Sequence, residues 1–140
     1  MKKLIIVAVL GGTAFFTANA LGAPSGDAVR AVQTASHGLS TKPVELDRGR
    51  KHWEVTFANG TERKVTLDGR RVTSTRRDDD RAAEPTGVSL VAVLRAAAPK
   101  ASGQIEDADL DDGVWTVSIG AHDVDVDPRT GKVLRVTRDD

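Results

Sequence analysis

The chain has 140 residues, with 20 lysine and arginine residues against 20 aspartate and glutamate residues, and it contains no cysteine. This length fits one ordinary domain or two very small ones, and the balanced charge argues against a generally basic nucleic-acid-binding protein. The lack of cysteine excludes disulfides, thiolate metal sites, iron–sulfur clusters and a cysteine nucleophile.

The first twenty residues predict a signal peptide. Two lysines precede an uncharged, mostly apolar run over residues 4–16, and small residues follow at Ala18 and Ala20. We expect cleavage after Ala20, with Ala23 as the alternative site. An uncleaved membrane anchor is the other interpretation, but the apolar run is shorter than the roughly 20 residues of a spanning helix. The protein is therefore expected to be secreted or periplasmic, of the bacterial kind, and free of the membrane after cleavage.

The rest of the sequence predicts one unit that is present twice. The pattern Trp-x-Val-x-Phe at residues 53–57 recurs 62 positions later, at residues 115–119, as Trp-x-Val-x-Ile. The apolar stripe of a helix and the last strand match at the same offset, and the insertions fall in turns. We therefore expect copy one over residues 27–79, a polar linker over residues 80–87, and copy two over residues 88–140.

Copy one begins with a short helix that Asp27 caps, with apolar residues at positions 28, 29, 31, 32 and 35 forming one face. The alternation at residues 53–57 predicts a strand, and a shorter strand is expected around Val44 and Leu46. Asn59-Gly60 then predicts a two-residue hairpin turn.

Copy two repeats this order. Ser89 is the expected helix cap, and Pro99 ends the helix because it lacks a backbone N–H. The strand at residues 115–119 is followed by one with Val124 and Val126 facing inward. Each copy is expected to be an α+β unit, a short helix packed on a small antiparallel β-meander. Such a unit buries little surface, so the copies should pack together, sheet beside sheet.

The stretch from Trp115 (WTVSI) through VDVDPRTGKVL, which ends at Leu134, resembles the PepSY domain. Copy one is more divergent, because its Trp53–Phe57 segment fits but its turn is shorter. The resemblance implies a tandem PepSY protein, without catalysis, that restrains a peptidase or binds another exported protein. A monomer or weak dimer without a cofactor is expected. If the protein inhibits, the hairpin at Trp53–Leu67 or Trp115–Val126, or an extended edge strand, should dock on the partner.

No motif of a catalytic site is present. The three histidines are isolated, and there is no nucleophile elbow, phosphate-binding loop or dinucleotide fingerprint. A nucleic-acid target is not expected, because no aromatic residues alternate with the basic ones. We therefore expect a binding protein and not an enzyme.

An acidic segment is the candidate for the alternative function, weak calcium binding in the cell envelope or outside the cell. Its carboxylates resemble the start of a calcium loop, but the glycine comes one place late and the bidentate glutamate is missing. A solvated turn is the favoured interpretation. The candidate ligands are Asp107, Asp109, Asp111 and Asp112.

The candidates for partner binding are two tryptophans and three alternating aspartates. The aspartates are expected on one face of a strand, where they repel one another unless the face is wet or meets cations. Copy one has 11 basic and 8 acidic residues, a net charge of +3, and copy two has 6 and 10, a net charge of −4. The two faces either complement each other or are solvated independently. The residues are Trp53, Trp115, Asp123, Asp125 and Asp127.

Overall fold

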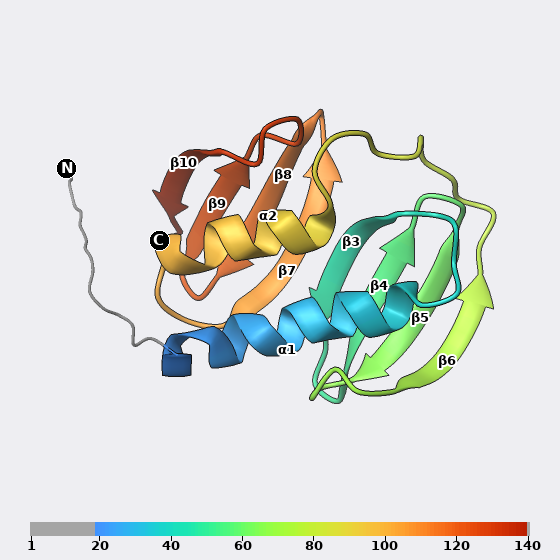
Figure 1. The fold of residues 1–140 in the computed structure, drawn as a ribbon. Helices are drawn as coiled ribbons and strands as arrows, with labels where there is room; N and C mark the ends of the chain where they lie inside the picture. The colour runs from blue at the N-terminus through green and yellow to red at the C-terminus, as the bar shows by residue number, and fades with distance from the viewer. Residues whose placement is uncertain (1–18, 140) are drawn as a thin grey trace.

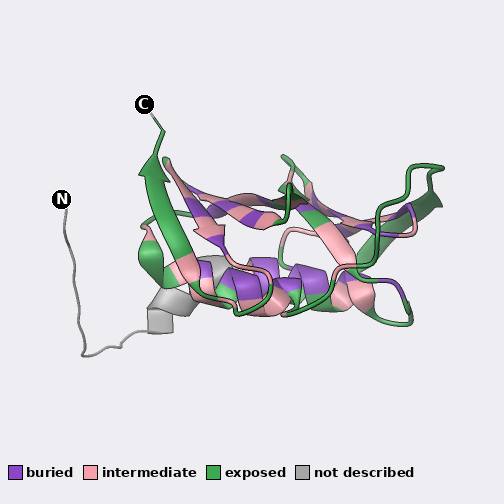
Figure 2. Cartoon of the chain, turned by 90° about the horizontal axis from the view of Figure 1, so that it is seen from above, coloured by how far each residue is buried: buried purple, intermediate pink, exposed green. Residues whose placement is uncertain are grey.

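A computed structural model describes residues 19–139 of the chain, with side chains from residue 26 onward. Two α-helices lie on one face of a sheet, and the other face carries no helix (Figures 1 and 2). The first half contains α1 (Asn19–Ser36), β3 (Pro43–Arg48), β4 (His52–Phe57), β5 (Thr61–Thr66) and β6 (Val72–Arg77). The second half contains α2 (Leu90–Ala97), the 3₁₀ turn η2 (Ala98–Lys100), β7 (Ile105–Asp111), β8 (Val114–Ile119), β9 (His122–Val126) and β10 (Val133–Arg138).

The strands form one eight-stranded antiparallel sheet in the order β10-β9-β8-β7-β3-β4-β5-β6. The expected fold, two PepSY-like repeats that are each a short helix on a small β-meander, is therefore wrong. The two halves are joined by pairing of β3 with β7, with Leu46 opposite Ala108. This pairing satisfies backbone groups that two separate sheets would expose at their edges, and it leaves both residues fully buried.

Helix α1 is longer than the sequence predicts. It runs through Asp27, so this residue lies inside the helix and is not its cap. Its Arg30 Nη1 is 3.5 Å from the Asp27 carboxylate and donates to the Asp68 carbonyl at 2.9 Å, which ties α1 to the turn after β5. Helix α1 packs against β3, β4 and β5 and also against β7 and α2. Helix α1 therefore contacts both halves of the protein and holds them together on the helix side of the sheet.

The predicted start of α2 is confirmed. Ser89 is the N-cap, and its side chain accepts a hydrogen bond from the Ala92 N–H. Helix α2 ends at Ala97, and η2, which contains Pro99, follows directly. A proline cannot donate to the carbonyl four residues earlier, so the α-helical hydrogen bonding stops here.

The core lies between the helices and the sheet. Strands β4 and β8 show the same alternation of half-buried and buried residues, and the first buried residue of each is a tryptophan, Trp53 or Trp115. From α1, three alanines face the sheet and let the helix approach it closely. Each large apolar side chain buried in this layer contributes about 1.5–3 kcal/mol to stability.

The predicted signal peptide over residues 1–20 lies outside the described residues, except for Asn19 and Ala20 at the start of α1. The alternative cleavage site at Ala23 also falls in the first part of this helix. Within residues 19–139, no helix is both long enough and apolar enough to cross a membrane.

Candidate functional site

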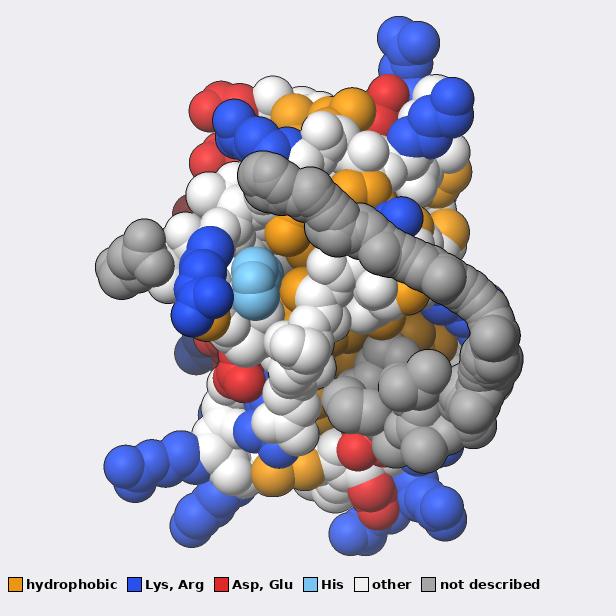
Figure 3. All heavy atoms as spheres, turned by 90° about the vertical axis from the view of Figure 1, so that its left-hand side faces the viewer, with side chains coloured by type: hydrophobic (Ala, Val, Ile, Leu, Met, Phe, Trp, Pro, Cys, Tyr) orange, Lys and Arg blue, Asp and Glu red, His pale blue; other side chains and the backbone are white. Residues whose placement is uncertain are grey.

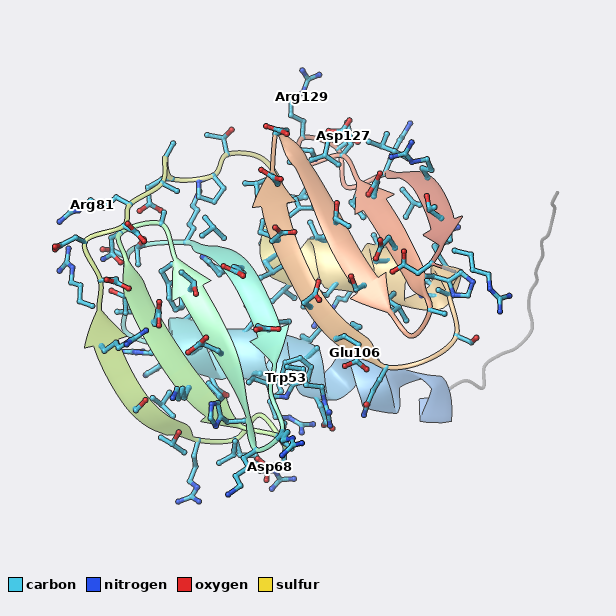
Figure 4. All side chains as sticks on the ribbon, turned by 180° about the vertical axis from the view of Figure 1, so that it is seen from behind. Trp53, Asp68, Arg81, Glu106, Asp127 and Arg129 are labelled. Carbon is cyan, nitrogen blue, oxygen red and sulfur yellow. The ribbon has the colours of Figure 1, made fainter. Side chains whose placement is uncertain are left out.

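The face of the sheet opposite the helices carries rows of acidic side chains, which Figure 4 shows from behind. The alternation that buries Trp115, Val117 and Ile119 under the helices directs the intervening side chains to this open face. The strand pairing then aligns these side chains across all eight strands. We call the following residues the acidic face: Glu45, Asp47, Glu54, Glu62, Asp107, Asp109, Asp123 and Asp125.

Two complete rows cross the open face, each built from directly opposed residues. The first row, from β10 to β6, is Arg135, Asp125, Thr116, Asp109, Glu45, Thr56, Glu62 and Arg76. The second row is Thr137, Asp123, Ser118, Asp107, Asp47, Glu54, Lys64 and Ser74. Both rows place carboxylates in the middle of the sheet, and the first row has an arginine at each end.

The ends of the acidic face are neutralised by ion pairs with the edge strands. Arg135 on β10 donates to the Asp125 carboxylate at 2.9 Å, and Arg76 on β6 donates to Glu62 at 2.8 Å. Both arginines are largely exposed, so each pair contributes little to stability. Seen from the side of the molecule on which β10 lies, lysine and arginine side chains project around the outline (Figure 3).

The central carboxylates are held close to one another where β3 meets β7. Asp47 lies opposite Asp107, and Glu45 lies opposite Asp109. Burial, followed by the negative charges of Asp109 and Asp47, raises the pKa of Glu45. Burial is also the main reason why the pKa values of Asp107 and Asp109 are raised. The fold therefore holds several carboxylates close together, and a bound cation would reduce the repulsion between them.

The charge division between the copies takes a different form in the structure. Copy one has a net positive charge in sequence, but its Glu45, Asp47, Glu54 and Glu62 join the carboxylates of copy two on one face. Four of its eight arginines lie in the exposed edge strand β6 and the preceding turn. On the open face, acidic side chains therefore gather at the centre of the sheet and arginines at its edges. The two copies do not form one acidic and one basic face.

The predicted partner-binding aspartates are not all on this face. Asp123 and Asp125 lie on it, where they accept hydrogen bonds from Ser118 at 2.8 Å and Thr116 at 3.1 Å. Asp127 follows the end of β9 and lies in the turn before β10, at the end of the strands (Figure 4). The backbone N–H of Arg129 binds its carboxylate at 2.8 Å and lowers its pKa.

The two tryptophans lie under the helices. Trp53 and Trp115 are each 1% exposed, so neither ring offers a surface to a macromolecular partner in the folded chain. The hairpins that carry them are β4–β5 and β8–β9, and all four strands are paired on both sides. Addition of a partner strand to these two hairpins is therefore blocked, because their backbone groups are already paired. The edge strands β6 and β10, which the prediction also allowed, are each paired on one side only.

Three of the four candidate calcium ligands lie on a strand, and the fourth lies in the turn that follows it. Asp107, Asp109 and Asp111 belong to β7, and Asp112-Gly113 forms the turn to β8 with positive φ at both residues, 51° and 75°. Alternate residues of a strand point to the same face and follow one another at roughly 6.7 Å along it, so Asp107, Asp109 and Asp111 form a row and do not surround one point. Among the described residues, no group of three or more histidine, aspartate or glutamate side chains is arranged to hold a metal ion.

Comparison with known proteins gives little guidance. No protein-family model matches the chain, and no curated protein is similar to it in sequence. A solved structure that is similar to it is a protein of the DUF2874 family from Bacteroides vulgatus ATCC 8482, which is described as a candidate periplasmic protein. The two share 13% identity with a TM-score of 0.30, over 81% of this chain and 93% of the other. Function has to be argued from the surface itself.

Proposed function

We propose that the protein is an exported, non-catalytic binding module, and that its acidic face binds a lysine- and arginine-rich segment of another exported protein. The observation that carries this proposal is the pairing of β3 with β7. It places Glu45 opposite Asp109 and Asp47 opposite Asp107, with no basic residue between the members of either pair. The PepSY-like stretch at Trp115–Leu134 and the predicted signal peptide support the exported, non-catalytic part of the proposal.

The dimensions of the acidic face fit an extended segment. From Asp125 on β9 to Glu62 on β5 the first row crosses five strand spacings, which is roughly 24 Å at about 4.8 Å each. An extended chain of about seven residues covers this distance. The threonine and serine side chains between the carboxylates, Thr56, Thr116 and Ser118, are short and leave room for a backbone across the rows.

Charge is the specific source of affinity in this proposal. Burial is the main cause of the raised pKa values of Glu45 and Asp107, and repulsion between neighbouring carboxylates adds to it. Ammonium or guanidinium groups brought against the paired carboxylates would offset this repulsion. Such an interaction steers association and weakens steeply with salt. A secreted peptidase with a basic surface segment is one partner of this kind, and inhibition of a thermolysin-like peptidase by the mature protein would identify it.

The test is a titration with a labelled heptalysine peptide, followed by fluorescence anisotropy at low and high salt. We expect binding that is lost at about 0.5 M salt, because the Debye length falls to a few ångströms. The double variant Asp47→Asn/Asp107→Asn should weaken binding at least tenfold. The matched control is Asp78→Asn/Asp79→Asn, which removes two exposed charges outside the acidic face and should change binding little. Equal losses in both variants would refute a specific site.

A further inference from the structure

A second candidate site is the free edge of β10, the last strand at one end of the sheet. Within the described residues β10 pairs only with β9, so one side of its backbone has no neighbouring strand. On the paired side, the Asp139 N–H donates to the Ala121 carbonyl at 2.7 Å. Hydrogen-bonded and non-hydrogen-bonded pairs alternate along an antiparallel ladder, so the N–H and C=O of Val136 point away from β9. This edge can therefore form backbone hydrogen bonds with an added strand.

The helix side of β10 carries two exposed apolar side chains. Val136 lies opposite Val124, which is fully buried in the core, and the alternation of the strand directs Leu134 to the same side. Helix α2 packs on β8 and β9, and Leu134 and Val136 remain 57% and 43% exposed. Figure 2 shows β10 as an exposed strand next to the C-terminus. An added strand with apolar residues on this side would extend the core beyond β9.

The charge of β10 is positive. Arg135 lies on the open face opposite Asp125 and donates to its carboxylate at 2.9 Å, but the arginine side chain remains 72% exposed. The strand contains a second arginine, Arg138, and no acidic residue. A carboxylate placed across from Arg135 on an added strand would put the guanidinium between two carboxylates, and opposite charges across a strand pair are favourable. The edge is therefore complementary in charge to an acidic strand.

The pairing of β9 with β10 shows what kind of sequence matches this strand. Strand β9 alternates aspartate and valine, and it places Val124 opposite Val136 and Asp125 opposite Arg135. An added segment with the same alternation would place its valines on the helix side, beside the exposed apolar residues of β10, and its aspartates on the open face. The free edge therefore favours a segment that resembles β9.

A second copy of this chain is a poor occupant of the edge. Strand β6, at the other end of the sheet, carries Arg76 and Arg77, and β10 carries two arginines of its own. Pairing of β10 with either edge strand of another copy would bring like charges close together. The two edges also differ, because β6 has one large exposed apolar residue, Val72, among the described residues and β10 has two.

We propose that β10 binds an extended segment of a partner protein, in which apolar and acidic residues alternate, by strand addition. Backbone groups of the segment pair with the free side of β10, its apolar residues pack beside Leu134 and Val136, and its carboxylates lie toward Arg135. This site takes a segment of opposite charge to the one proposed for the acidic face, so it goes beyond that function and does not depend on it.

The probe is an end-capped, labelled peptide with the sequence of residues 121–127, Ala-His-Asp-Val-Asp-Val-Asp. Binding to the mature protein is followed by fluorescence anisotropy and by the backbone amide resonances in a ¹⁵N-correlated NMR spectrum. We expect a Kd of about 0.1 mM or below at low salt. The amide resonance of Val136 should move downfield because its N–H gains an acceptor, while those of Arg135 and Thr137, which point toward β9, should move less.

Two altered peptides test the charge and the backbone pairing with the protein unchanged. A peptide with asparagine in place of each aspartate should bind at least tenfold more weakly, because it loses the attraction to Arg135. A peptide with proline in place of both valines should also bind at least tenfold more weakly, because proline has no N–H to donate to the edge.

Variants of the protein test the assigned groups. Leu134→Ser/Val136→Ser changes two exposed side chains and should weaken peptide binding at least tenfold, and Arg135→Gln should weaken it several-fold. The matched control is Val72→Ser on the other edge strand, which should change binding little. The acidic-face variant Asp47→Asn/Asp107→Asn should not weaken it, so the two proposed sites can fail independently.

The proposal is overturned if about 1 mM peptide leaves the Val136 amide unmoved. It is equally overturned if the asparagine or proline peptide binds as well as the original. Shifts of the β9 amides in place of that of Val136 would show that the peptide displaces β9, which also refutes addition at the edge. Dimerisation of the mature protein that Leu134→Ser/Val136→Ser abolishes would refute it too, because the occupant would then be a second copy.

Discussion

The two buried tryptophans provide a matched pair for measuring how much a buried hydrogen-bond donor without an acceptor lowers the stability of the protein. Trp53→Phe and Trp115→Phe each remove the same atoms from strands with the same burial pattern. The first substitution breaks the Nε1–Leu67 hydrogen bond, and the second removes a donor that has no acceptor. The difference between their effects on the free energy of unfolding therefore isolates the hydrogen-bonding contribution.

The expected difference in the free energy of unfolding follows from the hydrogen bonding of the two indole N–H groups. Losing the hydrogen bond of Trp53 costs about 0.5–1.5 kcal/mol, whereas removing the buried, unpaired donor of Trp115 recovers about 1–3 kcal/mol. Both variants also lose packing, by similar amounts. We expect Trp53→Phe to be more destabilising than Trp115→Phe by about 2–4 kcal/mol.

The assay is urea unfolding of the mature protein and both variants, followed by circular dichroism. Equal m-values check that each protein still unfolds in two states. Equal losses, or a larger loss for Trp115→Phe, would show that Trp115 Nε1 has an acceptor in the folded protein and would refute the reasoning.

Three further predictions concern the acidic face, a glycine and metal ions. Because the folded pKa values of Glu45 and Asp107 are raised, the native state binds more protons than the unfolded chain just above the ordinary carboxyl pKa values, so stability should fall as pH rises through that window. Glu45 is exposed and solvent screens its repulsion, so Glu45→Gln should add only about 0.3 kcal/mol at pH 7 while flattening this part of the pH profile of urea unfolding. Gly87→Ala places a Cβ against the Pro128 carbonyl at a φ of +93° and should cost about 3 kcal/mol or more, whereas Gly38→Ala, at a φ of +79° with open space around it, should cost only about 1 kcal/mol in the same measurement. Calcium and magnesium should raise the melting temperature equally at millimolar concentration, since both only screen the acidic face; a shift specific to calcium would instead support a calcium site.

Local features of the fold follow from the sequence where one residue type has one physical role. Ser89 caps α2 because its hydroxyl satisfies the free Ala92 N–H, and Pro99 stops the helix because it has no N–H to donate. The alternation after Trp53 and Trp115 correctly predicts which residues of β4 and β8 are buried. These features depend on neighbours within a few residues.

The start of α1 and the nature of β7 did not follow from local patterns. Asp27 has the chemistry of a helix cap, but α1 continues past it toward the N-terminus. The acidic segment at residues 107–112 has the composition of a loop, yet residues 107–111 belong to β7. Its charged side chains are tolerated in a strand because they alternate onto the open face, and strand β3 supplies the hydrogen bonds for its backbone.

The distribution of charge also depends partly on the sequence alone and partly on the tertiary structure. The sequence by itself determined the balance of 20 basic and 20 acidic residues, the alternation of the strands and the positions of the two tryptophans. Only the tertiary structure decided that β3 pairs with β7, which brings carboxylates from both halves into common rows and leaves arginines at the edges. Strand alternation assigns each side chain to one of two faces, but the row it joins depends on pairing between residues about 60 positions apart, such as Asp47 and Asp107. The two tryptophans likewise hold matching positions in the sequence pattern, but within the described residues only the indole N–H of Trp53 has an acceptor.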